Sequence, residues 1–406
     1  MKYDIVIIGG GASGLCTAIM SKTETNSILI IDHEDRVGKK ILSTGNGKCN
    51  LTNRYCRTEL FSSNPEGIYP YFPEANRAFA ETVISSFDAD QAIQFFQGLG
   101  ILTEDKNGYI YPRSEQASSV LDCLRFRCET LGIDMALGYQ PMKISKRDDL
   151  FYIDDEYSCK KLVLATGGMS APNTGSDGSG YEFAKSLRHH IVEPIPSLCG
   201  LKCSDPFFKA LAGVRNDSKL SLYDDQKNLL IEAQGNLQFN DYGVSGIPVF
   251  QISSVAGRLL KDGKRLILRI DLLPEVSFNE LAGFIDSKSE NYLLGVLNKK
   301  LSQVIEKEIS RKKGCENVSN GYLRACMIKR FKVHPIDITS FAQSQVTAGG
   351  VSVDEIRPDT CESKLVDNLY FTGEIMDING ICGGYNLHWA WASAYCASNA
   401  LKEDSK

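Results

Sequence analysis

The stretch YDIVIIGGGASG, residues 3–14, decides the fold of this chain. Its first half is an apolar, β-branched run that predicts a strand. The run then breaks into glycines at the first, third and sixth positions of the pattern G-x-G-x-x-G, and helix-compatible residues follow from Leu15 to Met20. We therefore expect a strand, a tight glycine turn and a helix, which is the phosphate-binding arrangement of dinucleotide folds.

Each glycine of this pattern has its own physical task. Gly9 permits the sharp turn at the end of the strand, Gly11 lets the backbone approach a pyrophosphate, and Gly14 lets the helix pack closely on the sheet. The N-terminus of the expected helix offers free N–H groups and a partial positive charge, which favour an anion. The stretch therefore predicts a site for the phosphates of a nucleotide.

A carboxylate follows at the expected distance. A second apolar run, residues 27–31, ends in Asp32, eighteen residues after Gly14. An acid about 20 residues beyond the glycine pattern binds the ribose hydroxyls of an adenine dinucleotide. Adenine dinucleotide binding is therefore expected, and these residues alone leave the identity of the dinucleotide open.

Length and charge restrict the possible functions. A chain of 406 residues has room for two or three domains. Its net charge is −5, with acids and bases interspersed and without a long basic tract, so a nucleic acid is not an expected partner. No apolar run approaches the length of a membrane span, and no secretion signal precedes the first strand, so a cytoplasmic protein without a membrane segment is expected.

The cysteines do not form a recognisable pattern. The chain has 13 of them, scattered and without a C-x-x-C pair, and Cys199 and Cys203 fit neither a redox dithiol nor a standard zinc site. Reduced, mostly buried thiols are the expected state. No metal site is predicted, because His189-His190 also lacks the spacing of metal ligands.

Two further segments are rich in small and polar residues. Residues 35–53 are dense in Gly, Lys and Asn, which permits either contact with a cofactor or a solvated loop. Residues 162–168 form an apolar strand that ends in Ala-Thr-Gly-Gly, where the chain can pass close to a cofactor or can simply turn. The glycines of residues 173–180 are spaced differently, so the chain carries one dinucleotide fingerprint.

The pattern of the chain changes twice along its length. Helical spacing is expected over residues 74–100, short alternating runs begin near residue 192, and an apolar stripe of helical spacing lies near residues 293–305. The predicted fold class is α/β, with a Rossmann-like FAD/NAD(P)-binding domain interrupted by an inserted β-barrel-like plus helical domain. The predicted boundaries give residues 1–191 and 341–406 to the first domain and residues 192–340 to the insert.

The chain resembles the bacterial BaiN/RdsA-type (YhiN-like) family of FAD-dependent oxidoreductases. The resemblance rests on GGGASG at 9–14, DRVGKKILSTGNGKCNLTN at 35–53, ATGGMSAPNTGSDGSGYEFAKSLRH at 165–189, QVTAGGVSVDEIRPDTCESKL at 345–365 and LYFTGEIMDINGICGGYNLHWAWASAY at 369–395. These segments include both ends of the chain and both junctions of the insert, so the resemblance covers the whole chain.

The resemblance implies FAD as the cofactor and a set of contact residues. Asp32 replaces the Glu that many relatives carry, Met142 would meet the adenine through its backbone where relatives often have Val, and Cys361 and Cys382 replace the usual Met and Thr. The implied FAD-binding residues are Gly9, Gly11, Ala12, Ser13, Gly14, Asp32, His33, Gly38, Lys39, Lys40, Gly45, Asn50, Met142, Gly168, Glu374, Asp377, Asn386 and Leu387.

The expected activity is that of an FAD-dependent oxidoreductase. The main hypothesis is a reductase that takes electrons from NAD(P)H as a transient co-substrate and reduces a small organic substrate by hydride transfer. An FAD-dependent RNA-modifying enzyme and a non-catalytic flavin-binding redox module are the alternatives. Tyr385, His388 and Asp377 could move protons, but a structural role is favoured for each, so no catalytic residue is assigned; the sequence also leaves the oligomeric state open.

Overall fold

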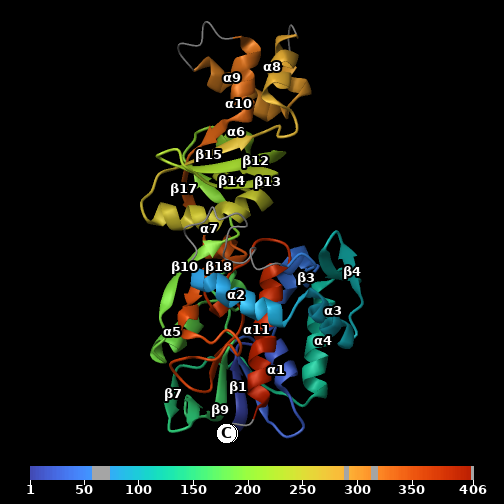
Figure 1. Ribbon diagram of the computed structural model, residues 1–406, viewed down its shortest axis with the longest axis vertical. Helices are drawn as coiled ribbons and strands as arrows, with labels where there is room; N and C mark the ends of the chain where they lie inside the picture. Colours follow the sequence, from blue (N-terminus) through green and yellow to red (C-terminus); the bar gives the residue numbers. More distant parts are fainter. Residues whose placement is uncertain (57–73, 288–291, 312–318, 404–406) are drawn as a thin grey trace. The chain divides into compact units, whose positions relative to one another are not determined.

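The computed structural model describes residues 1–56, 74–287, 292–311 and 319–403 of the chain. Contacts divide the chain into two compact units (Figure 1). The terminal unit comprises Met1–Ile195 and Gln345–Lys406, and the insert unit comprises Pro196–Ser344. These junctions lie four residues beyond the predicted domain boundaries at 191/192 and 340/341.

A mainly parallel sheet forms the centre of the terminal unit. Its order is β6-β2-β1-β9-β8-β7, with β19 also paired to β9. The strands β1, β2, β6, β9 and β19 run parallel, whereas β7 and β8 form an antiparallel hairpin on β9. The bounds are β1 Lys2–Ile8, β2 Ile28–Asp32, β6 Asp134–Leu137, β7 Ile144–Arg147, β8 Leu150–Ile153, β9 Tyr157–Leu164 and β19 Leu369–Phe371.

Two distant parts of the chain meet on the central strand β9. Leu162, Val163 and Leu164 pair with β1 on one side and with β19 on the other. All three side chains are fully buried, which is expected of a parallel strand covered on both faces. The sheet therefore joins the first and last segments of the sequence around one core.

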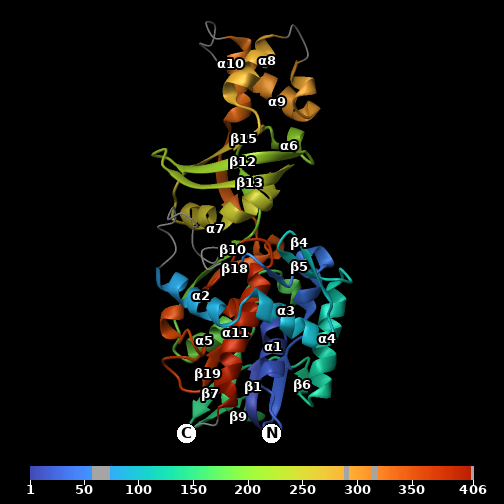
Figure 2. The same ribbon diagram turned by 45° about the vertical axis from the view of Figure 1, so that its right-hand side comes forward.

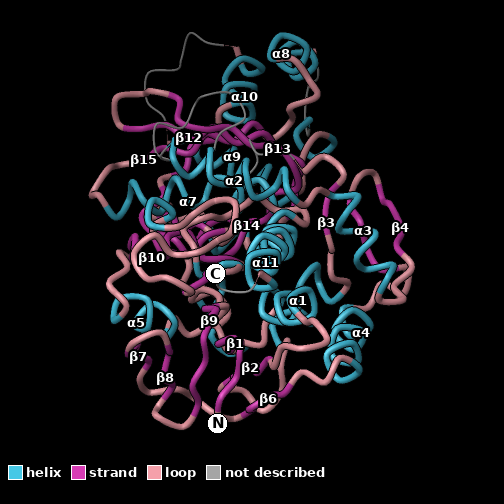
Figure 3. Tube along the Cα trace, turned by 60° about the horizontal axis from the view of Figure 1, so that its bottom comes forward, coloured by secondary structure: helices cyan, strands magenta, loops and turns pink. Residues whose placement is uncertain are grey.

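Helices from both ends of the chain cover the sheet together. Figures 2 and 3 show α11 (Tyr385–Lys402), α1 (Ala12–Ser21) and α4 (Ala117–Thr130) side by side. The helix α1 contacts both of the others. The start of α1 is thereby fixed against the C-terminal segment, and this arrangement brings the two ends of the sequence to one site.

The single helix expected over residues 74–100 is two helices, α2 (Glu74–Ser86) and α3 (Ala89–Gly98). Asp88 separates them: its side chain accepts a hydrogen bond from the backbone N–H of Gln91, whose side chain accepts one from the N–H of Asp88. This capping box starts a new helix, so the prediction of a continuous helix was wrong.

Smaller elements complete the terminal unit. The strands β3 (Thr52–Asn53), β5 (Tyr109–Pro112) and β4 (Thr103–Lys106) form a three-stranded antiparallel sheet. The helix α5 spans Ser179–Ser186, and β10 (Ile191–Ser197) pairs with β18 (Val346–Val351).

The insert unit is β-rich and then helical along the sequence. Its antiparallel sheet has the order β16-β15-β12-β13-β14-β11-β17. The end strands β16 and β17 are separated only by His334, and a barrel-like form of this sheet stays a prediction. The strands are β11 Leu201–Cys203, β12 Arg215–Asp224, β13 Leu229–Asn240, β14 Gly243–Gly246, β15 Leu266–Asp271, β16 Phe331–Val333 and β17 Pro335–Ile338.

Helices follow the strands of the insert unit. The helix α7 (Ile247–Lys261) contacts β13, and its buried residues are mostly apolar. The helices α8 (Phe278–Asp286), α9 (Lys299–Ser310) and α10 (Asn320–Lys329) come after β15, and α10 contacts both of the others. A one-turn helix, α6 (Phe208–Leu211), precedes β12. The unit thus has its own core of sheet and helix residues.

The described helices include none that is long and apolar enough to cross a membrane. The cysteines in the described ranges are all free. The same residues contain no cluster of His, Cys, Asp and Glu that could hold a metal ion.

Candidate dinucleotide site

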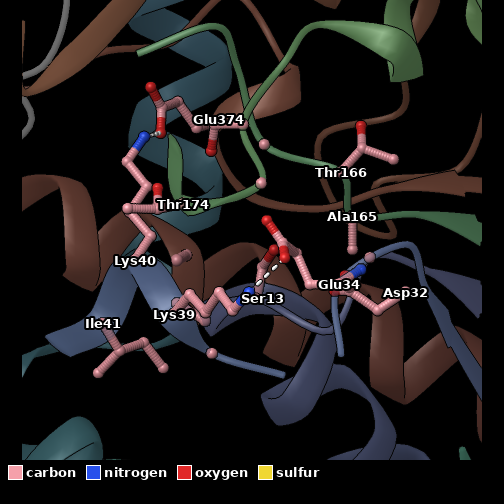
Figure 4. Close-up of a pocket in the computed structure, with 18 of the residues that line it drawn as sticks. Ser13, Asp32, Glu34, Lys39, Lys40, Ile41, Ala165, Thr166, Thr174 and Glu374 are labelled. Carbon is pink, nitrogen blue, oxygen red and sulfur yellow. Dashed lines mark hydrogen bonds and ion pairs between the residues drawn. The ribbon is translucent and has the colours of Figure 1, made fainter. Parts of the chain in front are cut away.

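A cavity lies in the terminal unit at the carboxyl ends of β1, β2 and β9. Its empty volume, including the open mouth, is about 1240 Å³. The glycine turn, the end of β2, residues 38–44 and residues 165–167 line it together with residues near the C-terminus (Figure 4). Ligands of open α/β sheets bind outside the carboxyl ends of the strands, so this is the expected place for a dinucleotide.

The three glycines of the fingerprint differ in their surroundings. Gly9 has a φ of +104°, and a Cβ on it would lie 2.5 Å from the carbonyl oxygen of Ala165. A Cβ on Gly14 would lie 1.9 Å from the carbonyl oxygen of Gly9. A Cβ on Gly11 would meet no atom within 4 Å, and Gly11 lines the cavity. Two glycines thus permit close packing, and the third leaves space for a ligand.

The start of α1 fits an anionic group. Gly11 is the N-cap residue, and no side chain caps this end of the helix. Ala12 and Ser13 also line the cavity, and Ser13 Oγ donates to the carbonyl oxygen of Thr372 over 3.2 Å. The first N–H groups of a helix have no partner within the helix, so a pyrophosphate could accept hydrogen bonds from them here.

Asp32 links the end of β2 to the glycine turn. Its Oδ2 accepts a hydrogen bond from the N–H of Gly10 over 2.7 Å, and its Oδ1 accepts one from the N–H of Glu34 over 2.9 Å. Asp32 and His33 both line the cavity. Each carboxylate oxygen retains acceptor capacity, so the residue can still bind ribose hydroxyls.

Two consecutive lysines that line the cavity form ion pairs with acidic side chains. Lys39 pairs with Glu34 and with Asp35, the latter at 2.8 Å. Lys40 Nζ lies 2.8 Å from Glu374 Oε2. Figure 4 shows Lys39 beside Glu34 and Lys40 beside Glu374. These residues begin the 3₁₀-helical segment η1 (Lys39–Gly47), which follows Gly38 at a φ of +78°.

Glu374 is held by two partners. Its Oε1 accepts a hydrogen bond from the N–H of Thr347 over 2.7 Å, while Oε2 faces Lys40. Thr347 Oγ1 in turn accepts from the N–H groups of Met169 and Ser170, over 2.8 and 3.1 Å. The turn after β9, the strand β18 and Glu374 therefore form one hydrogen-bonded wall.

The start of α11 forms another part of the cavity. Gly384 is the N-cap residue at a φ of +96°, and no side chain caps the helix. Asn386 and Leu387 line the cavity. The Asn386 side chain also closes the preceding turn, because its Oδ1 accepts from the N–H of Gly380 and its Nδ2 donates to that residue's carbonyl oxygen. A second helix N-terminus thus faces the site.

Twelve of the predicted contact residues line the cavity, and six do not. Met142 is 85% exposed and its N–H donates to the Asp154 carboxylate, while Gln140 and Pro141 line the cavity instead. The contact of Met142 with adenine stays a prediction. The lining residues among those predicted are Gly9, Gly11, Ala12, Ser13, Asp32, His33, Gly38, Lys39, Lys40, Glu374, Asn386 and Leu387; the others are Gly14, Gly45, Asn50, Met142, Gly168 and Asp377.

Sequence reasoning missed several polar lining residues. Thr166 and Thr174 lie in the segments 162–168 and 173–180, but neither threonine was among the predicted contacts. Gln345 lies at the junction of the insert. Glu34 lines the cavity two residues after Asp32. Glu34 and Thr166 each lie two residues beyond the end of a strand, β2 and β9, and this position was the available signal for them.

The three residues considered for proton transfer do not line the cavity. His388 is fully buried, and its Nδ1 shares a hydrogen bond of 2.8 Å with Thr52 Oγ1. Burial lowers the pKa of His388 to about 4 and raises the pKa of Tyr385 to about 12. Asp377 Oδ2 accepts a hydrogen bond from Asn76 over 2.9 Å. Packing and burial therefore support the structural roles that the sequence favoured.

Comparison with known proteins identifies the family. The HI0933-like protein Rossmann domain family matches residues 3–400. The chain belongs to this family. The family resemblance drawn from the motifs is thereby confirmed, and with it the assignment to FAD-dependent flavoprotein oxidoreductases.

Two full-length relatives have named activities. The chain is 36% identical to a 3-dehydro-bile acid delta(4,6)-reductase of Clostridium scindens, over 98% of this chain and 99% of the relative. It is 28% identical to a ribosomal RNA dihydrouridine synthase of Escherichia coli, over 100% of this chain and 99% of the relative. Both relatives match this chain from end to end, insert included.

A solved structure shows the same fold. The 3-ketosteroid-delta4-(5alpha)-dehydrogenase of Rhodococcus jostii matches with a TM-score of 0.51 and 12% identity, over 99% of this chain and 97% of that chain. At this identity the likeness concerns the fold alone. It agrees with a mixed α/β architecture built on a Rossmann-type domain.

Proposed function

We propose that this protein is an FAD-dependent reductase that takes electrons from NAD(P)H and reduces a carbon–carbon double bond conjugated to a carbonyl in a small organic molecule. The observation that carries the proposal is the end-to-end relationship to the 3-dehydro-bile acid delta(4,6)-reductase. A carbonyl draws electron density from a conjugated double bond, so its β-carbon accepts a hydride. The dinucleotide cavity supplies a place for the cofactor of such a reaction.

The residues of the cavity fit FAD. The uncapped start of α1 would hold the pyrophosphate, and Asp32 would hold the adenosine ribose. The remaining cavity, towards Lys40, Glu374 and the start of α11, would take the ribityl chain and the ring system. When bound, FAD would supply hydride transfer between a nicotinamide and the substrate.

A second candidate function follows from the other relative. Modification of ribosomal RNA at uridine is favoured by the full-length match to a dihydrouridine synthase. The net charge of −5 argues against it, because proteins that bind nucleic acids neutralise phosphates with basic residues. The small-molecule reductase is therefore the first choice, and a non-catalytic flavin module is the third.

The test begins with the FAD-reconstituted protein under anaerobic conditions. We expect NADH or NADPH to bleach the yellow cofactor, and a conjugated enone, such as a 4-en-3-one steroid, to restore the colour with a product heavier by two hydrogen atoms. No bleaching by either donor would refute the nicotinamide donor. No reoxidation by any enone, after reduction by dithionite, would refute the substrate class.

The RNA alternative has its own readout. Ribosomal RNA from a strain lacking the gene would be incubated with the protein, FAD and NADPH, and its nucleosides would be separated by mass spectrometry. Formation of dihydrouridine, together with inactivity on every enone, would replace the first proposal by the second.

A further inference from the structure

We propose that Lys40 is the catalytic acid of this reaction and that Glu374 positions it. The inference rests on the proposed function and adds a residue for the proton that must accompany the hydride. The sequence assigned Lys40 and Glu374 only to cofactor contact. Their geometry points to a further role.

The two residues form an ion pair inside the cavity. Lys40 Nζ and Glu374 Oε2 are 2.8 Å apart, and the two side chains are 23% and 20% exposed. Both line the cavity, on the part of its wall away from Asp32, as Figure 4 shows. Asp32 and the start of α1 mark the adenine and pyrophosphate end, so the ion pair lies towards the reactive end of a bound dinucleotide.

Glu374 is oriented so that it holds one N–H of the lysine. Its Oε1 is engaged by the N–H of Thr347 and its Oε2 by Lys40. An ammonium group has three donors. In the described part of the structure, Lys40 Nζ pairs with Glu374, and two of its N–H groups remain for other acceptors. The lysine is therefore anchored and can still donate a proton.

Other polar groups that line the cavity are less suited to give a proton. The hydroxyl of Thr44 donates to the carbonyl oxygen of Ile41 over 2.6 Å, and the Asn386 amide is bonded to the turn at Gly380. The side chain of Gln345 is an amide, which does not act as an acid. Thr174 also lines the cavity, and its hydroxyl donates to the carbonyl oxygen of Ala171 over 2.7 Å. Among these groups, Lys40 carries the transferable proton.

The proposed step adds one hydride and one proton to the conjugated double bond. A hydride from reduced FAD adds to the β-carbon of the enone, the carbon–carbon π bond breaks, and its electron pair moves to the α-carbon and carbonyl oxygen. Lys40 Nζ gives its proton to the α-carbon, which completes the saturated ketone. The neutral amine regains a proton from water. NAD(P)H restores the two electrons, so each turnover consumes one hydride and one proton.

The experiment compares two ways of reoxidising the reduced, FAD-saturated protein. A conjugated enone requires a proton on carbon, whereas a quinone can take its protons from water on oxygen. The variants are Lys40→Met, which removes the proton and the charge, and Lys40→Arg, which keeps the charge but is a poor acid. Lys48→Met is the matched control, because Lys48 pairs with Glu115 at 2.7 Å and does not line the cavity.

We expect both Lys40 variants to reoxidise with the enone at least about 100-fold more slowly than the wild type, the low end of general acid catalysis. Their reoxidation by quinone should change much less, and the FAD reduction potential of Lys40→Arg should match the wild type. The wild-type rate with the enone should fall at alkaline pH, and this fall should be absent in Lys40→Met. Lys48→Met should behave as the wild type. Glu374→Gln should slow the enone step partly and shift its pH profile.

Several results would overturn the inference. Enone reoxidation at the wild-type rate in Lys40→Met would remove Lys40 from the step. Recovery by Lys40→Arg would mean that charge alone is needed. Equal slowing with enone and quinone would indicate general damage to the FAD site. If the reduced wild type fails to react with any enone, the proposed function falls, and the role of Lys40 falls with it.

Discussion

The backbone N–H of Gly10 donates a hydrogen bond of 2.7 Å to Oδ2 of Asp32. The acid that would hold the ribose thus also fixes the glycine turn that would hold the phosphates. A Cβ on Gly10 would lie 2.3 Å from Cγ1 of Val37, so that side of the turn has no room for a side chain. The two parts of the dinucleotide fingerprint are therefore coupled by direct contact.

Replacing Asp32 by Asn should weaken FAD binding and loosen the turn. The amide has one acceptor oxygen in place of two, so the bond to either Gly10 or Glu34 is lost. The negative charge that would face the ribose hydroxyls is lost with it. Hydrogen bonds to charged groups contribute about 1.5–3 kcal/mol, so FAD affinity should fall by about 10- to 100-fold. Quenching of FAD fluorescence during titration with the protein measures this affinity. Asp35→Asn is the control, because that side chain is 77% exposed; equal affinities of the Asp32 variant and wild type would contradict the assignment.

Alanine at Gly14 should lower the stability of the protein, whereas alanine at Gly11 should lower its FAD affinity. A Cβ at Gly14 would lie 1.9 Å from a backbone oxygen, so the variant should be destabilised by about 1–3 kcal/mol or fail to fold. A Cβ at Gly11 would enter open space in the cavity, so the FAD-free protein should melt as the wild type does. Its FAD affinity should nevertheless fall by more than about tenfold, or 1.4 kcal/mol. Thermal melting with and without FAD separates the two cases, and unchanged FAD binding by the Gly11 variant would move the pyrophosphate elsewhere.

Buried His388 should make the terminal unit acid-sensitive. Burial lowers its pKa from 6.5 to about 4, so the unfolded chain binds a proton in this range before the folded chain does. The contribution to stability is complete above pH 6.5 and is lost as the pH falls towards 4, by about 3 kcal/mol in total. His388→Gln should therefore lose less stability than the wild type between pH 7 and pH 4.

The fluorescence of Trp389 and Trp391 reports this unfolding, because both tryptophans of the chain lie in α11. Urea titrations of the FAD-free protein at several pH values give the free energy of unfolding at each pH, and hence its slope against pH. A slope identical in His388→Gln and the wild type would show that His388 does not titrate in this range.

Lys161 should stabilise the end of α11. The residue is 8% exposed, and its Nζ donates to the carbonyl oxygens of Ala400 and Leu401, over 3.3 and 3.2 Å, and of Glu403. Its positive charge also interacts favourably with the negative end of the helix dipole. Lys161→Met should lower the free energy of unfolding by about 1–3 kcal/mol, measured by thermal melting. Lys160→Met, at a 56% exposed side chain, should melt within a degree or two of the wild type; equal melting of the two variants would rule out the cap.

Local sequence patterns predicted the elements that depend on neighbours in the chain. The strand before Gly9, the helix after Gly11 and the carboxylate at Asp32 follow from backbone preferences and from a fixed offset along one strand–helix–strand unit. The division of the helix expected over residues 74–100 also has a local signal in the sequence. Asp88 is followed three residues later by Gln91, and this pair forms a capping box that starts the second helix.

The sequence by itself therefore determined the glycine turn between β1 and α1, the acid at the end of β2 and the family to which the chain belongs. Only the tertiary structure decided which residues face one another across the cavity. Lys40 and Glu374 are 334 residues apart, and they meet because β19 pairs with β9 and carries the following segment to the end of the sheet. No local periodicity encodes such a contact, since it depends on the packing of strands whose order in the sheet differs from their order in the chain.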